Sequence, residues 1–203
     1  MKLFVVRHGE TAWSRERRFT GAHDIPLAAA GVAQAEAIAH ALAGEQLAAV
    51  YASPLDRTRT TADIIAKPHR LSVQIDSDLR EMAFGRWEGR IREDVAREEP
   101  ELWRTWREAP PALTAHGGET VSDVAARVDA FVARVGERHG GQSVVVVTHA
   151  VVIRLLVLGA LGLGPERLWS VDASPAGITE LELGAEWSTV HRMNTLSHLG
   201  ATS

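Results

Sequence analysis

Four short apolar runs in the chain have the pattern of buried β-strands. Residues 2–6 and 143–147 are almost continuous in Leu, Phe and Val, which is typical of strands covered on both faces in a parallel sheet. Residues 48–52 form a third apolar run, and residues 71–75 alternate polar and apolar positions. We therefore predict a strand over each of these four ranges.

Apolar residues at helical spacing lie between these runs. Residues 28–43 are rich in alanine and repeat apolar positions every three to four residues, a pattern that favours a helix. A second helix is predicted over 54–67, with Ser53 as its N-cap. A long amphipathic helix is predicted over 119–137, and a further helix over 150–158, directly after the last apolar run.

The alternation of strands and helices predicts an α/β fold, a three-layer α/β/α sandwich with a mostly parallel central sheet. Residues 177–183 and 187–193 are expected to add two edge strands. The charged, tryptophan-containing stretch of about residues 85–118 breaks the alternation, and we interpret it as a small inserted helical cap. The whole chain, 1–203, is expected to form a single domain.

Composition narrows the chemistry. The chain has no cysteine, which excludes disulfides and thiolate metal sites, and its net charge of −4 at pH 7 gives no overall attraction to nucleic acid. The first apolar run stops at Arg7, too short for a secretory signal, so a cytoplasmic location is expected. The longest apolar stretch, residues 144–164, contains His149 and Arg154, and an arginine inside a bilayer costs about 2.5–3.5 kcal/mol. No membrane partner is therefore expected.

Three polar clusters follow three of the predicted strands. They contain Arg7 with His8, Ser53 with Arg57, and His149. Taken singly, each has an ordinary structural explanation, such as a surface ion pair or a hydrogen-bonded core histidine. The carboxyl ends of parallel strands meet at one edge of the sheet, however, and two arginines and two histidines gathered there favour a bound dianion.

Five segments resemble, in order, the motifs of the histidine phosphatase superfamily, in the branch that contains cofactor-dependent phosphoglycerate mutases and small-molecule phosphatases such as alpha-ribazole phosphatase. The resemblance runs over nearly the whole chain. The segments are residues 3–11 (LFVVRHGET), 53–62 (SPLDRTRTTA), 79–89 (LREMAFGRWEG), 117–120 (GGET) and 147–154 (VTHAVVIR).

The resemblance implies a role for each matching residue. His8 is the expected nucleophile that accepts the phosphoryl group, and Glu81 the expected proton donor to the leaving group. Arg7, Arg57 and a protonated His149 are expected to hold the phosphoryl oxygens and to supply the positive charge that Mg²⁺ provides in other phosphoryl-transfer enzymes. No metal and no cofactor are expected. His8 must be neutral to attack, so its other ring nitrogen is expected to donate to a backbone carbonyl.

Weaker expectations concern further contacts to the phosphate. Thr20 and Gly21 match the loop that closes on the phosphate in the family. Ser14 stands where many members have an asparagine, and Ala150 where a glycine is common. These four residues complete the expected substrate-binding and phosphate-binding set.

The sequence leaves two kinds of alternative open. The stretch between Glu81 and residue 117 is short for a mutase, so hydrolysis of a small-molecule phosphate ester is favoured over phosphoglycerate mutation. Arg90, Arg92 and Arg97 nevertheless offer cations that a mutase would need. A non-catalytic phospho-ligand binding protein is the third reading, and the presence of both expected catalytic residues argues against it.

Two further questions stay open at the level of sequence. Trp103 and Trp106 are read as packing residues of a short amphipathic helix in preference to walls of the substrate pocket. The predicted edge strands leave a homodimer open.

Overall fold

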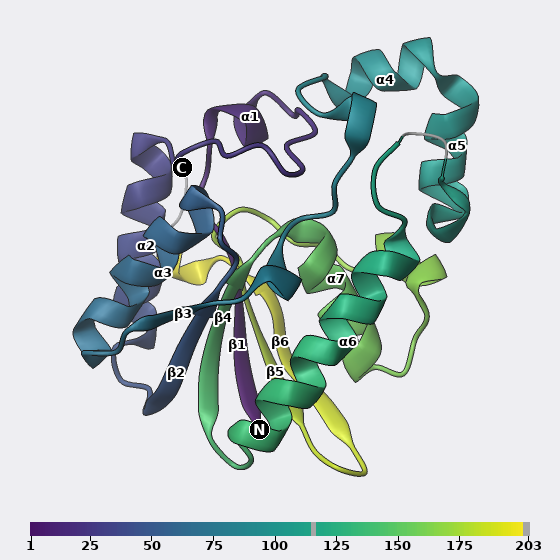
Figure 1. Cartoon of the computed structure of the whole chain (residues 1–203). Coiled ribbons are helices and arrows are strands. Elements are labelled where there is room, and N and C mark those ends of the chain that lie inside the picture. The colour runs from purple at the N-terminus through teal and green to yellow at the C-terminus, as the bar shows by residue number, and fades with distance from the viewer. Residues whose placement is uncertain (115–116, 201–203) are drawn as a thin grey trace.

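The computed structural model describes residues 1–114 and 117–200, which form a six-stranded sheet covered by helices on both faces (Figure 1). The strand order is β3-β2-β4-β1-β5-β6. Neighbouring strands among β1 to β4 pair in parallel, whereas β5 is antiparallel to both of its neighbours. This arrangement confirms the predicted three-layer α/β/α sandwich with a mostly parallel sheet.

All four strands predicted from apolar runs are present, with ends shifted by one or two residues. These four strands are β1 (Lys2–Arg7), β2 (Leu47–Ala52), β3 (Val73–Ile75) and β4 (Ser143–Thr148). The two C-terminal strands are β5 (Ile178–Leu183) and β6 (Ser188–Thr195).

The prediction that residues 177–183 form an edge strand is wrong. The strand β5 lies between β1 and β6, so β6 is the edge strand on this side of the sheet and β3 is the edge strand on the other. This inner strand contains the acidic residue Glu180, whose exposed fraction is 7%. Its carboxylate is 2.7 Å from Lys2 Nζ and also pairs with Arg192. These two cations explain how an inner strand accommodates an acidic residue.

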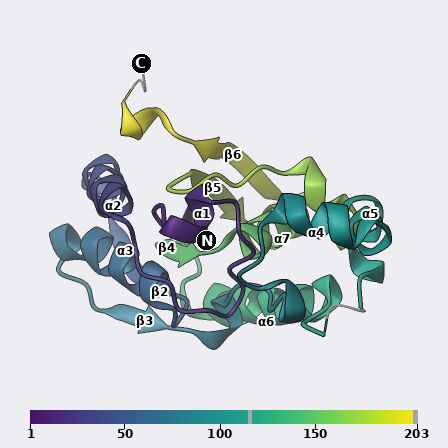
Figure 2. The ribbon, with the colours of Figure 1, turned by 90° about the horizontal axis from the view of Figure 1, so that it is seen from above.

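The predicted helices also form, two on each face of the sheet (Figures 1 and 2). The helices α2 (Ala29–Leu42) and α3 (Asp56–Ala66) cover one face, and α6 (Val121–Arg138) and α7 (Ala150–Ala160) cover the other. The expectation that Ser53 is the N-cap of the second of these is wrong. The cap position is Leu55, without a side-chain hydrogen bond, and Ser53 is fully buried at the end of β2.

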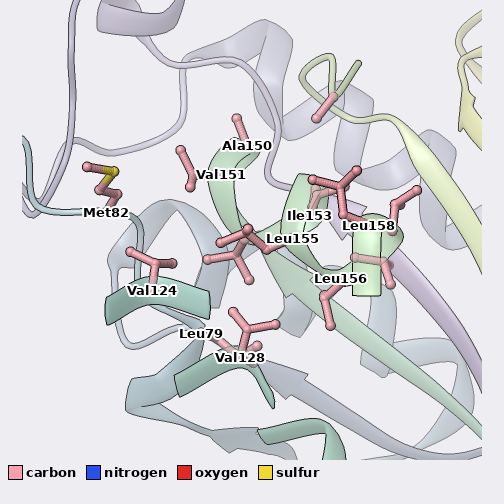
Figure 3. Packing of buried hydrophobic residues seen from close by; sticks show 14 of the residues in the cluster. Leu79, Met82, Val124, Val128, Ala150, Val151, Ile153, Leu155, Leu156 and Leu158 are labelled. Carbon is pink, nitrogen blue, oxygen red and sulfur yellow. The ribbon is translucent and has the colours of Figure 1, made fainter. Parts of the chain in front are cut away.

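Each inner strand contributes to two separate hydrophobic clusters. In β1, Leu3 and Val5 pack with α6 and α7, whereas Phe4 and Val6 pack with α2 and α3. This alternation follows from side chains pointing to opposite faces along a strand. Figure 3 shows the first cluster, where α7 packs against α6 and Leu79. Burying one such Val or Leu side chain contributes about 1.5–3 kcal/mol, so the sheet is a rigid base for the segments at its carboxyl ends.

Several short helices lie beyond the carboxyl ends of the strands (Figure 1). They are α1 (Ala12–Arg15), α4 (Arg92–Glu98) and α5 (Pro100–Glu108), with the 3₁₀ turns η3 (Gly85–Trp87) and η4 (Pro110–Ala112). The remaining 3₁₀ turns are η1 (Lys67–His69), η2 (Ser77–Leu79), η5 (Pro165–Ser170) and η6 (Ser197–Leu199).

The expected cap, about residues 85–118, contains α4 and α5, although residues 115–116 of that range lie outside the described part. Its indole side chains hold it to the domain. Trp87 and Trp106 have exposed fractions of 0% and 2%, and both belong to the hydrophobic cluster on the α6 and α7 face. We therefore propose that the cap and the sheet form one folding unit over residues 1–203.

Candidate active site

The ends of β1, β2 and β4 meet at one edge of the sheet, as expected. Arg7 pairs with Thr148 across β1 and β4, and the rings of His8 and His149 lie edge to face with centroids 5.2 Å apart. A cavity opens above this edge. We use "strand end" for the part of its wall formed by Arg7, His8, Arg57 and Glu81.

His8 is fixed in an orientation that suits a nucleophile. Its Nδ1 lies 2.8 Å from the Gly9 carbonyl oxygen, and because a carbonyl only accepts, Nδ1 carries the proton and Nε2 keeps a free lone pair. Burial, and then the charges of Arg57 and Arg7, holds the pKa of His8 well below its usual 6.5. The imidazole is therefore neutral at pH 7, as the sequence analysis expected.

The backbone approaches closely at the residue after His8. A Cβ at Gly9 would lie 2.3 Å from the Gly31 carbonyl oxygen of α2, so only glycine fits without a shift of the backbone. This contact explains why the strand-end histidine is followed by glycine.

The two strand-end arginines are held by backbone carbonyls. Arg57 is fully buried and donates to the carbonyl oxygens of His23 at 2.7 Å and Gly21 at 3.0 Å. Arg7 donates to Ala173 at 2.7 Å, and burial lowers its pKa to about 10, against the attraction of Glu81. Both remain cations at pH 7. Among the described residues, neither buried Nε has a hydrogen-bond partner, and a buried donor of this kind favours an anion nearby.

His149 lies one layer behind His8. It is the N-cap residue of α7 and fully buried, with Nε2 2.9 Å from the Ser53 hydroxyl. Burial, followed by the charges of Arg57, His8 and Arg7, holds its pKa well below 6.5. His149 is therefore neutral in the protein without a bound anion, and the expectation of a protonated His149 beside a phosphoryl group stays a prediction. His149 is not among the described residues that line the cavity.

The carboxylate of Glu81 lies at the N-terminus of α7 and attracts the guanidinium groups of Arg7 and Arg57. One carboxylate oxygen accepts from the backbone N–H of Ala150 at 3.1 Å, and the other from Val151 at 3.3 Å and Met82 at 3.0 Å. Free N–H groups at a helix N-terminus attract a negative charge, which explains this position. Ala150 lines the cavity as expected, but its N–H already serves Glu81.

The expected supporting residues Ser14, Thr20 and Gly21 all line the cavity. The Ser14 hydroxyl belongs to a capping box, where it donates to the Thr11 carbonyl oxygen at 2.9 Å and accepts from the Thr11 N–H at 2.9 Å. Its one proton is therefore engaged. Gly21 has φ +51°, and a Cβ there would lie 2.1 Å from a Glu88 carboxylate oxygen, so any other residue strains the backbone and requires Glu88 to move.

The opposite side of the cavity contains residues that the sequence analysis missed or left open. We call Arg92, Arg107, Arg154 and Trp169 the "cap end" of the cavity. Of these, only Arg92 was considered from sequence. One local signal was available for Arg154, which lies four residues after Ala150 and therefore on the same face of α7. Trp169 and Arg107 had no such signal.

Two arginines and two tryptophans were also left open as residues of the substrate pocket. Arg90 pairs with Glu98 and Glu99, and Arg97 with Asp94 and Glu98; neither lines the cavity among the described residues. The two tryptophans left open, 103 and 106, do both things considered for them, because each lines the cavity and packs in the hydrophobic cluster.

Within residues 1–114 and 117–200, no group of three or more histidine or acidic side chains is arranged to hold a metal ion. Over the same residues, no helix has the length and apolar character needed to span a bilayer.

The family model of the histidine phosphatase superfamily, branch 1, matches residues 3–196. The chain belongs to this superfamily. Its relatives include phosphoserine phosphatase 1 of Hydrogenobacter thermophilus, 34% identical over 98% of this chain and 95% of that protein, and phosphoglycerate mutase-like protein 4 of Arabidopsis thaliana, 34% identical over 99% and 88%.

Solved structures of the superfamily have the same fold. One is a mycobacterial glucosyl-3-phosphoglycerate phosphatase in complex with VO3, which superposes with a TM-score of 0.89 at 29% identity, covering 96% of this chain and 99% of that one. The phosphatase names among these relatives agree with the expected phosphoric monoester hydrolase.

Proposed function

We propose that this histidine phosphatase hydrolyses small-molecule phosphate monoesters without a metal ion, through a phosphohistidine intermediate on His8, with Glu81 as general acid and base. The observation that carries the proposal is the state of His8: a neutral imidazole with Nδ1 held by a carbonyl, beside two buried arginines that each retain an unpartnered N–H.

In the first step, His8 Nε2 attacks phosphorus in line with the leaving oxygen. The N–P bond forms, the P–O bond to the leaving alcohol breaks, and the leaving oxygen takes the proton of the Glu81 carboxyl group. Phosphoryl transfer needs charge stabilisation more than covalent assistance, and Arg7 and Arg57 supply it. A phosphate dianion beside Glu81 opposes a second negative charge there and so favours the protonated acid.

In the second step, water attacks the phosphohistidine. Glu81, now a carboxylate, takes a proton from the water, the N–P bond breaks, and the bonding pair returns to His8 Nε2. Inorganic phosphate leaves and the starting protonation states are restored. The same carboxyl group thus serves as acid and then as base.

His149 supports the reaction from behind His8. Its neutral state removes one positive charge from the neighbourhood of the nucleophile, and its buried Nδ1 has no partner among the described residues. A bound phosphate dianion favours proton uptake at this imidazole. His149 therefore adds positive charge when the anion is present, and not before.

A mutase remains the second candidate, and one observation favours it. Arg92, Arg107 and Arg154 line the same cavity as His8, and a mutase needs cations to retain a small acid while the phosphoryl group waits on the enzyme. One of the relatives also has a mutase-like name. A non-catalytic binding protein is the third candidate, and nothing observed favours it over the other two.

The test is hydrolysis of p-nitrophenyl phosphate with excess EDTA, run beside isomerisation of 3-phosphoglycerate primed with 2,3-bisphosphoglycerate. Chelator-insensitive hydrolysis without isomerisation supports the proposal, whereas efficient isomerisation with little hydrolysis makes the chain a mutase. Tight stoichiometric binding without turnover makes it a binding protein. His8→Ala should abolish hydrolysis. The matched control is His191→Ala, because His191 is an exposed histidine of β6 that pairs with Glu182 of β5.

A further inference from the structure

The cap end of the cavity carries more positive charge than the chemistry at His8 uses. Among the described residues, seven arginines line the cavity. Two have carboxylate partners, since Arg17 pairs with Glu93 at 2.9 Å and Arg18 with Glu16 at 2.5 Å. The other five face one unpaired lining carboxylate, that of Glu81.

The arginines of the cap separate into two groups. Those that point away from the cavity have carboxylate partners: Arg104, for example, pairs with Glu101 on α5. Arg92 and Arg107 line the cavity, and neither has an ion pair within the described part of the chain. The same helices therefore neutralise their outward cations and leave the inward ones unpaired.

The unpaired guanidinium groups are held in place by stacking. The Cζ atoms of Arg107 and Arg154 lie 4.2 Å and 4.6 Å from the centroid of the Trp169 ring. Arg154 Nε also donates to the Val171 carbonyl oxygen at 2.9 Å, and the Trp169 indole donates to the Trp106 carbonyl oxygen at 2.7 Å. A stacked guanidinium keeps its N–H edge free for a planar anion, so the stack orients two cations without neutralising them.

Charge balance gives the ligand. A phosphate dianion beside a protonated Glu81 leaves three of the five unpaired arginine charges without a counter-charge in the described cavity lining, and Asp172, which lies outside that lining, attracts Arg154. We propose that Arg92, Arg107 and Arg154, oriented by Trp169, form a second anion site that binds a carboxylate or second phosphate on the leaving group of the substrate. This inference rests on the proposed function, since it assigns the leaving-group side of the same cavity.

The substrate class follows from this site. The preferred substrates are phosphate esters of hydroxy acids, or bisphosphates, and esters of uncharged alcohols of the same size are poorer. Loss of the second anion leaves charged groups facing each other without a partner, and a charge-assisted hydrogen bond lost in this way weakens binding by about tenfold or more.

The experiment compares kcat/KM within two matched pairs of esters. The first pair is 3-phosphoglycerate and glycerol 3-phosphate, which differ by a carboxylate, and the second is propane-1,3-diol bisphosphate and its monophosphate. We expect a preference of about tenfold or more for the doubly anionic member of at least one pair. The pair that shows it distinguishes a carboxylate site from a phosphate site.

The variants locate that preference. Arg107→Ala should remove it, by lowering kcat/KM for the doubly anionic member of the pair by about tenfold or more and for the other member by less. Arg104→Ala, one turn earlier on α5 and facing solvent, should keep it. Arg92→Ala is the second variant and should act as Arg107→Ala does, in case the latter loosens the cap. No preference in the unmodified protein, or equal loss on both members of a pair, overturns the inference.

A binding measurement separates this inference from the proposed function. The His8→Ala protein is titrated with 3-phosphoglycerate and with glycerol 3-phosphate by calorimetry. If no ester is hydrolysed, the proposed function fails, yet tighter binding of 3-phosphoglycerate that Arg107→Ala abolishes still supports the second anion site. Equal affinities for the two ligands overturn it, whether or not p-nitrophenyl phosphate is hydrolysed.

Discussion

At the strand end of the cavity, Arg57 is fully buried and its guanidinium donates to two backbone carbonyls. At the cap end, Arg107 is exposed and rests on one indole ring. The first arrangement is enclosed in the domain, because Arg57 lies in the first turn of α3, shortly after β2, and both of its acceptors are backbone carbonyls of residues 21–23. The second rests on the last turn of a nine-residue helix, where substitution disturbs little else. The difference supports the proposal that the buried strand end sets the reaction and the exposed cap end sets the preferred substrate.

The largest effect is expected from Glu81→Gln, a substitution at the strand end of the cavity. General acid catalysis contributes about 10²–10⁴-fold, so phosphorylation by an alkyl ester with a poor leaving group should slow by that factor. The aryl ester p-nitrophenyl phosphate needs no proton on its leaving group and should slow far less. Rapid-quench measurement of the phosphorylation step tests this, and equal losses on the two esters would contradict a general-acid role.

Arg57→Lys should lower kcat/KM for every phosphate ester alike, by about 10²–10³-fold, the usual effect of losing one fixed donor to a transition-state oxygen. Lysine keeps the charge but not the planar fork. The matched comparison is Arg107→Lys at the cap end, which should act only on substrates with a second anion. A loss that depends on the leaving group in Arg57→Lys would break the comparison.

The cap should be a structural part of the domain and not a separate lid. Trp106→Ala is expected to lower the free energy of unfolding by about 3–5 kcal/mol, because the side chain is 2% exposed. Trp187→Ala is the control, since 81% of that residue is exposed, and it should change stability by less than about 0.5 kcal/mol. Urea unfolding measures both, and similar small effects would show that α5 is not anchored.

The smallest expected effect is the pH dependence of stability that comes from the lowered pKa of His8. Burial, then Arg57 and Arg7, lowers the pKa of His8, so its NMR titration should show a neutral ring at pH 6, where a histidine in the unfolded chain, with a pKa near 6.5, is mostly protonated. Because the folded pKa is the lower one, the stability linked to His8 is present above pH 6.5 and is lost as the pH falls. Titration of His8 at 6.5 or above would contradict a preformed neutral nucleophile.

The sequence was sufficient where a signal is local. The near-continuous Val run of β4 and the motif around His8 each lie within ten residues, and both predictions agree with the structure. The edge position predicted for β5 was wrong because β6 pairs on its outer side. The pairing of Glu180 with Lys2, from a distant part of the chain, allows an acidic residue there, and no local pattern reveals this contact.

The cap end was hidden for the same reason. Arg107 and Trp169 come from α5 and η5, 62 residues apart in the chain, and nothing in the periodicity of either segment indicates their contact. The motif gave the neighbours of His149 but not the burial that lowers its pKa. The sequence therefore predicted the residues of the strand end, and the tertiary structure was needed for their protonation states and for the opposite wall of the cavity.

The central claim is that His8 carries the phosphoryl group. The most direct measurement is rapid quenching of the enzyme with ³²P-labelled substrate, followed by tests of the bound label for acid lability and alkali stability, the signature of a phosphoramidate. The account predicts labelled protein with these properties, no label in His8→Ala, and label retained in His191→Ala. Label that survives acid, or label in His8→Ala, would contradict it.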